Sequence, residues 1–189
     1  MIVKLKYVFE FLFFAALFSA CDSKSEHPTL DTTINGVVLL RNSASIERNF
    51  GDLMKKIDLK KDIPDVRIKN QSGTQYLRLA FYPGDNKNVF SLFEVSNNSL
   101  GSQNALSSSI LNFDTESGIK LGLSKTEVIN KKGNNYQESK KGDLIKLRYE
   151  IDEKKDKKFL DKYNMPLYVA EYFFKNDVLE TFSFGFEYP

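Results

Sequence analysis

The sequence predicts an α+β protein in which two tandem repeats, each a helix followed by antiparallel hairpin strands, share a two-layer sheet. Residues 33–51 and 115–133 align without gaps, and each stretch carries a helix-capping residue and closes on a glycine. Both are followed by stretches in which apolar and polar residues alternate. Such alternation is typical of strands with one buried face, which a capped helix can cover. We expect one sheet of roughly six strands, preceded by a signal peptide and a flexible tether.

Residues 1–20 have the layout of a secretory signal peptide. Lys4 and Lys6 give a positive start, and an apolar stretch runs from Tyr7 to Phe18 before two small residues. The stretch is shorter than the roughly 20 apolar residues that a comfortable transmembrane helix needs. An uncleaved anchor is the alternative interpretation.

The end of this segment, Phe18-Ser19-Ala20-Cys21, resembles the lipobox of bacterial lipoproteins. The resemblance implies that the peptide is removed and that Cys21 becomes a lipidated first residue. Several acyl chains would hold the protein on a membrane without a spanning helix. Since Cys21 is the only cysteine, no internal disulfide can form. We expect location in the cell envelope, with the outer membrane favoured.

Composition limits the possible partners. Residues 21–32 form the lipidated cysteine and a polar stretch that we expect to be a flexible tether. The chain has 27 basic and 25 acidic residues. Cleavage of the signal peptide would remove two basic residues and one acidic residue. A charge so close to neutral gives no electrostatic case for nucleic acid.

The second copy of the repeat has the clearest helix signals. Ser124 is a good N-cap, and Glu127 three residues later completes a capping box. Gly133 is placed to end the helix. The sequence therefore predicts a helix over 125–132.

The first copy has a weaker start. Asn42 is its polar cap and Gly51 closes it, but Ser45 stands where a capping-box acid would be. We expect residues 52–63 to continue as further helix up to Pro64.

The strands divide the chain into a first repeat (33–95), a connection (96–112) that is rich in Ser and Asn, and a second repeat (113–189). Strands are expected over 74–82, 89–95, 143–151, 167–174 and 178–188. In the last of these an aromatic stripe is expected to pack under the helices: Phe182, Phe184, Phe186 and Tyr188.

The phrase GIKLGLSKTEVINKKG (118–133) resembles the signature of small bacterial lipoproteins of the SmpA/BamE kind and each repeat of the β-lactamase inhibitor protein fold. The resemblance implies a two-layer α+β architecture, often in tandem. It also implies that the sheet or its edge binds protein, and it carries over no catalytic residues.

Catalytic chemistry has few candidates. His27 is the only histidine and lies in the expected tether, so Ser-His and Cys-His catalysis and common zinc sites are excluded from the folded part. No phosphate-binding or dinucleotide motif occurs, and we expect no cofactor or metal. Glu171 and Glu180 could face each other across the turn at 175–177, although surface charges explain them as well.

The strand over 74–82 places Leu77, Leu79 and Phe81 on one face and leaves Tyr76, Arg78 and Tyr82 on the other. Tyr and Arg are favoured in binding hot spots, so Tyr76, Arg78 and Tyr82 form the candidate protein-binding face. The sequence thus favours a non-catalytic, lipid-anchored envelope protein that binds a protein or an envelope component. Two alternatives stay open: an envelope hydrolase that uses carboxylates, and an inhibitor of a secreted enzyme.

Overall fold

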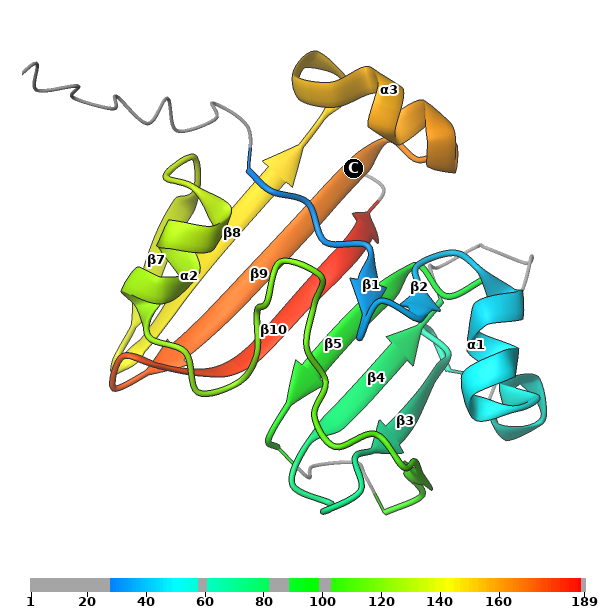
Figure 1. Cartoon of the computed structure of the whole chain (residues 1–189). Helices are drawn as coiled ribbons and strands as arrows, with labels where there is room; N and C mark the ends of the chain where they lie inside the picture. Colours follow the sequence, from blue (N-terminus) through cyan, green and yellow to red (C-terminus); the bar gives the residue numbers. More distant parts are fainter. Residues whose placement is uncertain (1–27, 58–60, 82–88, 99–102, 188–189) are drawn as a thin grey trace, which may run out of the picture.

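The computed structural model describes residues 28–57, 61–81, 89–98 and 103–187. Within these residues the protein is α+β, with three α-helices, a large mixed sheet and a small antiparallel sheet (Figure 1). The helices are α1 (Ser43–Phe50), α2 (Lys125–Lys132) and α3 (Glu153–Tyr163), with a short 3-10 helix η1 (Leu53–Lys56). The small sheet pairs β1 (Thr33–Ile34) with β2 (Val38–Leu39).

The large sheet has eight strands in the order β6-β3-β4-β5-β10-β9-β8-β7. Their bounds are β3 (Asp65–Lys69), β4 (Tyr76–Ala80), β5 (Leu92–Ser96), β6 (Leu106–Ser107), β7 (Gln137–Lys141), β8 (Leu144–Ile151), β9 (Leu167–Lys175) and β10 (Val178–Glu187). All neighbours are antiparallel except β6, which runs parallel to β3. The pairing of β5 with β10 joins the two halves of the chain.

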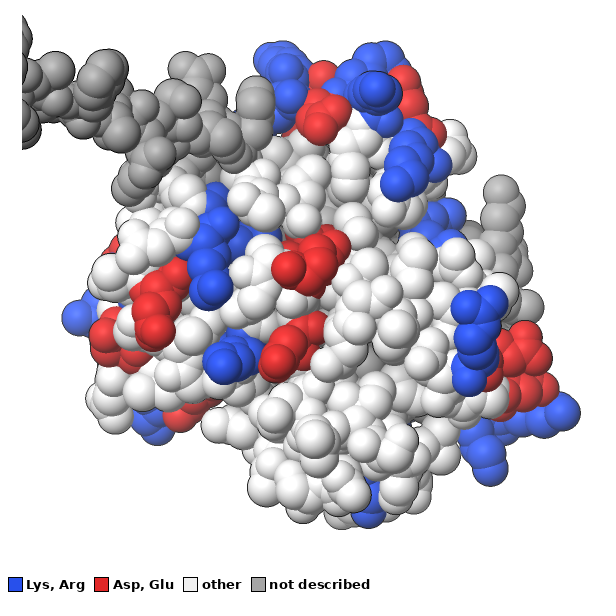
Figure 2. Space-filling view, viewed as in Figure 1, with Lys and Arg blue, Asp and Glu red and all other residues white. Residues whose placement is uncertain are grey.

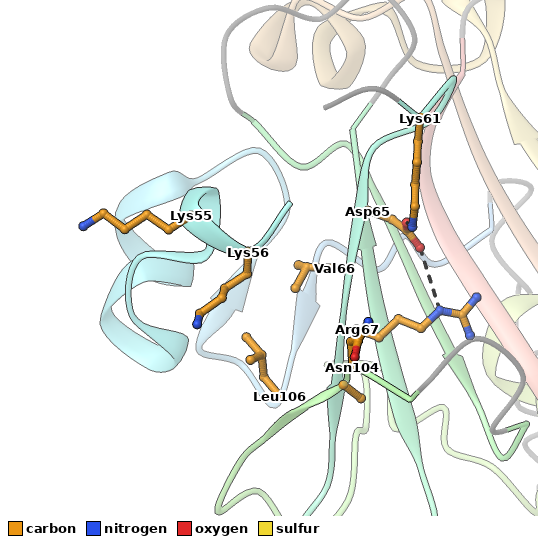
Figure 3. A pocket seen from close by; sticks show the side chains of 9 residues that line it. Lys55, Lys56, Lys61, Asp65, Val66, Arg67, Asn104 and Leu106 are labelled. Atoms are coloured by element: carbon orange, nitrogen blue, oxygen red, sulfur yellow. Dashed lines mark hydrogen bonds and ion pairs between the residues drawn. The ribbon is translucent and has the colours of Figure 1, made fainter. Parts of the chain in front are cut away.

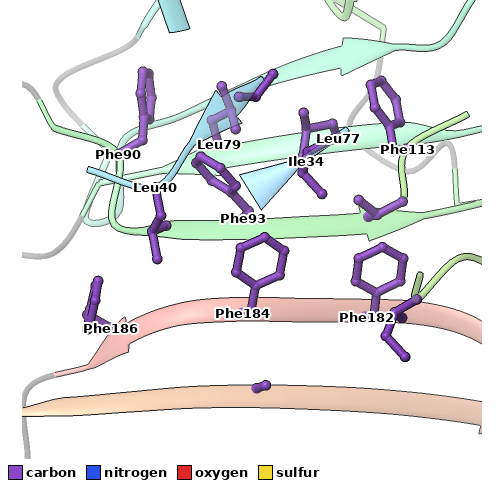
Figure 4. Packing of buried hydrophobic residues seen from close by; sticks show 14 of the residues in the cluster. Ile34, Leu40, Leu77, Leu79, Phe90, Phe93, Phe113, Phe182, Phe184 and Phe186 are labelled. Atoms are coloured by element: carbon purple, nitrogen blue, oxygen red, sulfur yellow. The ribbon is translucent and has the colours of Figure 1, made fainter. Parts of the chain in front are cut away.

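The core lies on one face of this sheet. Helix α2 and the β1–β2 hairpin lie on that face, α1 lies beside the hairpin, and α3 lies at the end of β8 and β9 (Figure 1). In the strands whose burial alternates, every second side chain points into the core. Figure 4 shows side chains of β5 and β10 in contact where these two strands pair. The rings of Phe93 and Phe184, for example, meet edge to face with centroids 5.5 Å apart. Phe182, Phe184 and Phe186 are buried as predicted, and Tyr188 lies outside the described residues.

The two predicted helix signals are confirmed. In α2 the Ser124 side chain accepts from the Glu127 backbone N–H, while the Glu127 carboxylate accepts from the Ser124 N–H at 2.8 Å. In α1 the Asn42 side chain accepts from the backbone N–H of Ser45 at 2.9 Å. The helices end at Gly51 and Gly133, both with positive φ.

The helix expected over 52–63 is reduced to η1 among the described residues, and 58–60 lie outside them. Gly51 stops α1 with φ 75°, so the chain cannot continue as one helix. The residues after it are mostly charged; Leu53 is buried, whereas Lys55 and Lys56 are exposed.

The sheet is larger than expected because the sequence did not predict β3, β6 and β7, although β3 alternates between half-buried and buried positions. Strand β6 falls within 96–112, which the sequence presented as a connection, and two residues are too few to show alternation. Its end is attached to β3 because the Ser108 N–H and hydroxyl both donate to the Lys69 carbonyl, at 3.1 and 2.9 Å. Strand β7 (QESKK) is exposed throughout, so no periodicity could indicate it. Charged residues on such an edge oppose pairing with other chains.

Residues 28–32, which the sequence assigned to the tether, pack against the second half of the chain. Pro28 and Asp31 are buried, and the segment crosses the covered face of the sheet (Figure 1). In the described part of the chain, no helix combines the length and apolar character needed to cross a bilayer.

Candidate functional site on the open face of the sheet

The face of the large sheet opposite the helices carries no covering element among the described residues (Figure 1). We call it the open face. Its charged and aromatic side chains are half-buried and come from alternate strand positions: Asp65, Arg67, Tyr76, Arg78, Glu94, Lys146, Arg148, Glu171 and Phe173. Tyr76 and Arg78 lie there because the intervening Leu77 and Leu79 enter the core. Tyr82, the third residue of the candidate face, lies outside the described residues.

Arg78 is the centre of one charged cluster. Its Nε donates to Asp65 Oδ2 at 2.9 Å on β3, and its Nη1 lies 3.6 Å from Glu94 Oε2 on β5. Lys61 also donates to Asp65, at 2.8 Å. Burial alone would raise the pKa of Asp65, but the hydrogen bonds from Lys61 and Arg78 outweigh it and lower that pKa below its usual range. Arg78 is therefore fixed across three strands by acidic partners on β3 and β5.

Arg148 on β8 is the centre of a second cluster. Its guanidinium donates to Glu150 at 2.6 Å, to Glu171 at 2.8 Å and to Glu187 at 2.8 Å. Lys146 adds a bond to Glu171 at 3.0 Å. Burial would raise the pKa of Glu171, but the bonds from Arg148 and Lys146 outweigh it and lower that pKa. The cluster ties β8, β9 and β10 together and holds Glu171 as a carboxylate.

Glu171 and Glu180 do not form a facing pair. The register of β9 with β10 places Glu171 opposite Ser183, and Glu180 falls at an irregularity between Leu179 and Thr181. A general acid needs a carboxyl group that keeps its proton near neutral pH. The environment of Glu171 favours the ionised state, so Glu171 is poorly suited to act as a general acid.

A basic groove borders the open face at the β3 edge (Figure 3). Strand β6 pairs only with Ile68 and Lys69, so the first part of β3 remains at the edge of the sheet. The groove there has a volume of about 640 Å³. Its charged lining is Lys55, Lys56, Lys61, Asp65 and Arg67. Asp65 and Arg67 belong to both the groove and the open face, so the two surfaces are continuous.

The groove could not be found from sequence. Its lysines fall in a run of mixed charges, which usually indicates a solvated helix or loop face. Only the fold brings η1 and residues 104–106 beside β3. The excess of cations over the one carboxylate suits an anionic or acidic ligand.

A buried polar cluster lies under the N-terminal segment, and we call it the Asp31 latch. The Asp31 carboxylate accepts from Lys132 Nζ at 2.8 Å and from the N–H and hydroxyl of Ser117 at 3.1 and 3.0 Å. The Asp31 N–H donates to the Tyr168 oxygen at 3.1 Å, and the Tyr168 hydroxyl donates to the Asp31 carbonyl at 2.7 Å. Asp31 and Lys132 are 0% and 1% exposed. Burial lowers the pKa of Lys132, while the Asp31 charge acts in the opposite direction.

No pattern in the sequence indicates this pairing, since Asp31 lies in a polar stretch and Lys132 is one of two lysines at the end of a helix. Every polar group in the latch has a partner, and these bonds attach the N-terminal segment to the body. Among the described residues, no group of three or more His, Cys, Asp and Glu side chains could hold a metal ion.

No protein family, curated protein or solved structure matches the chain.

Proposed function

We propose that this protein is a lipid-anchored lipoprotein of the cell envelope that binds a protein or an envelope component through the open face of its sheet and performs no catalysis. The observation that carries the proposal is the one-sided covering of the sheet. Helix α2, the hairpin and α1 beside it lie on one face, whereas the other presents fixed arginines and half-buried aromatic side chains. Arg and Tyr contribute strongly to binding when a partner desolvates them.

The positive charge of the basic groove indicates which kind of partner would bind beside the open face. The basic groove meets the open face at Asp65 and Arg67, and its lysines come from η1 and the segment after it. A partner that covers both surfaces would need acidic or anionic groups opposite the groove. We expect its binding to weaken as salt concentration rises.

The lipid anchor rests on the sequence around Cys21, which lies outside the described residues. The proposed location is the envelope, with the outer membrane favoured. An envelope hydrolase is less well supported, because Glu171 is held ionised by two cations. An inhibitor of a secreted enzyme would be one form of the proposed protein binder.

We also propose that the two halves are tandem repeats of the SmpA/BamE-like kind. Helices α1 and α2 are both eight residues long, both are capped by a polar side chain, and both end on a glycine with positive φ. In the sheet, β3-β4-β5 and β8-β9-β10 lie in mirrored order about the β5–β10 pairing. A duplicated unit related by a two-fold axis would have this order.

Site-specific photo-crosslinking in native envelopes tests the binding proposal. A benzoyl-phenylalanine at Tyr76 samples the open face, and one at Val37, which is 48% exposed on the hairpin, samples the covered side. We expect one defined adduct from position 76 that is absent from position 37 and is reduced by Arg78→Ala. Equal adducts from both positions, or an adduct from position 37 alone, would refute the open face as the binding surface.

A further inference from the structure

The N-terminal segment is fixed to the folded body by two sets of contacts. In the Asp31 latch, the buried carboxylate accepts from Lys132, and the Asp31 backbone exchanges hydrogen bonds with the Tyr168 hydroxyl. Glu116 adds a second attachment, since its carboxylate accepts from the N–H and the hydroxyl of Thr33, both at 3.0 Å. The chain therefore joins the body at one defined place.

That place is the end of the sheet where α3 lies. Tyr168 is the second residue of β9, directly after the connection from α3. The ring of Phe159 on α3 packs edge to face against Tyr168, with centroids 5.4 Å apart. Figure 1 shows the described chain beginning beside the arrowhead of β8, next to α3.

The sequence leaves little chain between this place and the lipidated cysteine. Seven peptide steps separate Cys21 from Pro28, and they span at most about 25 Å when fully extended. Strand β10 alone has ten residues, which correspond to about 33 Å along the sheet. A lipid anchor on Cys21 therefore keeps the α3 end of the body nearest to the membrane.

The surface at this end is rich in lysine. Helix α3 (EKKDKKFLDKY) carries five lysines against three acids, with one more acid, Asp152, as its N-cap. One acid, Asp161, is bound to Lys157 at 2.6 Å. Figure 2 shows lysine side chains over α3 with acidic side chains between them, and Lys154, Lys158 and Lys162 are exposed. Long lysine side chains can reach anionic headgroups while their stems stay on the protein.

We infer that the α3 end of the protein docks on an anionic phospholipid surface, and that the Asp31 latch sets this orientation. The inference rests on the proposed lipid anchor. In this orientation the open face and the basic groove stand at the side of the body, accessible to a partner. The opposite end, with the turns of the β3–β4 and β9–β10 hairpins, points away from the membrane.

A single-thiol labelling experiment can test this orientation. Cys21 is the only cysteine, so once it is lipidated an introduced cysteine is the only free thiol. Lys158→Cys places a fluorophore on α3, and Gln71→Cys places it on the exposed turn between β3 and β4 as the matched control. The lipidated full-length variants are reconstituted in vesicles of phosphatidylcholine and phosphatidylglycerol that contain a headgroup-nitroxide lipid quencher.

We expect quenching at position 158 to be severalfold stronger than at position 71, and the difference to shrink in vesicles of phosphatidylcholine alone. Equal quenching at both positions, or stronger quenching at position 71, would overturn the orientation while leaving the anchor intact. Flotation of the vesicles distinguishes a wrong orientation from a missing anchor. A protein that does not float with the vesicles lacks the lipid anchor, and the anchor and orientation proposals then both fail.

Two further variants test the role of the latch. A Gly/Ser insertion of about ten residues between Ser25 and Glu26 is long enough to release the constraint, and it leaves the latch in place. The double variant Asp31→Asn, Lys132→Met frees the segment itself, with circular dichroism as the check on folding. Both should float normally and lose most of the preference for position 158. A preference that survives the insertion would show that tether length does not set the orientation.

Discussion

At the scale of single residues, the Asp31–Lys132 pair is the feature on which the N-terminal segment most depends. Its charges are almost fully buried, and further donors satisfy the carboxylate. Breaking a buried pair by removing one partner is costly, because the remaining charge loses its compensation. The pair therefore specifies where the segment lies more than it adds net stability.

Lys132→Ala should lower the free energy of unfolding by about 3–5 kcal/mol. Lys131→Ala is the control, since Lys131 is the exposed neighbour on the same helix, and a surface change of this kind is worth at most about 0.5 kcal/mol. Urea denaturation of both variants measures the difference. Similar losses for the two would mean that the ion pair is not buried as described.

Gly185 is a second residue that the packing requires. It lies on β10 opposite Leu92, and a Cβ there would overlap the carbonyl oxygen of Ser91. That carbonyl accepts the Phe186 N–H at 2.9 Å, so it cannot move away freely. Gly185→Ala should therefore cost about 1–3 kcal/mol of stability through overpacking. Ser183→Ala on the same strand is the control in thermal denaturation, and a neutral Gly185→Ala would contradict the close approach.

At the scale of elements, helices and strands marked by signals within a short stretch of sequence were predicted better than pairings between distant residues. The bounds of α2 agreed with the structure because Ser124, Glu127 and Gly133 act within one helix. Strands β4, β5, β8, β9 and β10 were predicted because alternation reflects burial, whereas β3 was missed although its burial alternates in the same way. The edge strands β6 and β7 were missed because pairing with a neighbour, not burial, defines them. The same limit hid the groove and the latch, whose members lie far apart in the chain.

The Arg148 cluster makes the β8–β9–β10 region sensitive to acid. Glu171 has a folded-state pKa below its usual value, so its contribution to stability is present above that value and is lost as pH falls. Arg148→Met removes the shared donor and should destabilise the protein most above about pH 5, with the difference from the parent closing towards about pH 3.

The matched control for this prediction is Lys175→Met, since Lys175 and Asp143 are 3.8 Å apart and both are well exposed. Denaturation across this pH range should show little change for that variant. A constant difference between Arg148→Met and the parent at all pH values would show that the cluster does not titrate as argued.

At the scale of the whole molecule, one core spans both halves of the chain. The buried cluster runs without interruption from Leu77 and Leu79 in the first half to Tyr149 and Tyr172 in the second. Strands β5 and β10 join the halves through five register pairs. A protein built in this way should unfold as one cooperative unit, even if it arose from two repeats.

Phe184→Ala tests this cooperativity, because Phe184 is 1% exposed and packs across the junction against Phe93. The loss of so large a core side chain should cost about 3–5 kcal/mol. In native-state hydrogen exchange, the slowest amides of β4 and of β8 should lose equal protection if the halves unfold together. Phe173→Ala, on the half-buried open face, should cost much less and serves as the control. Loss of protection confined to β8, with β4 unchanged, would show that the two halves are separate folding units that happen to share a sheet.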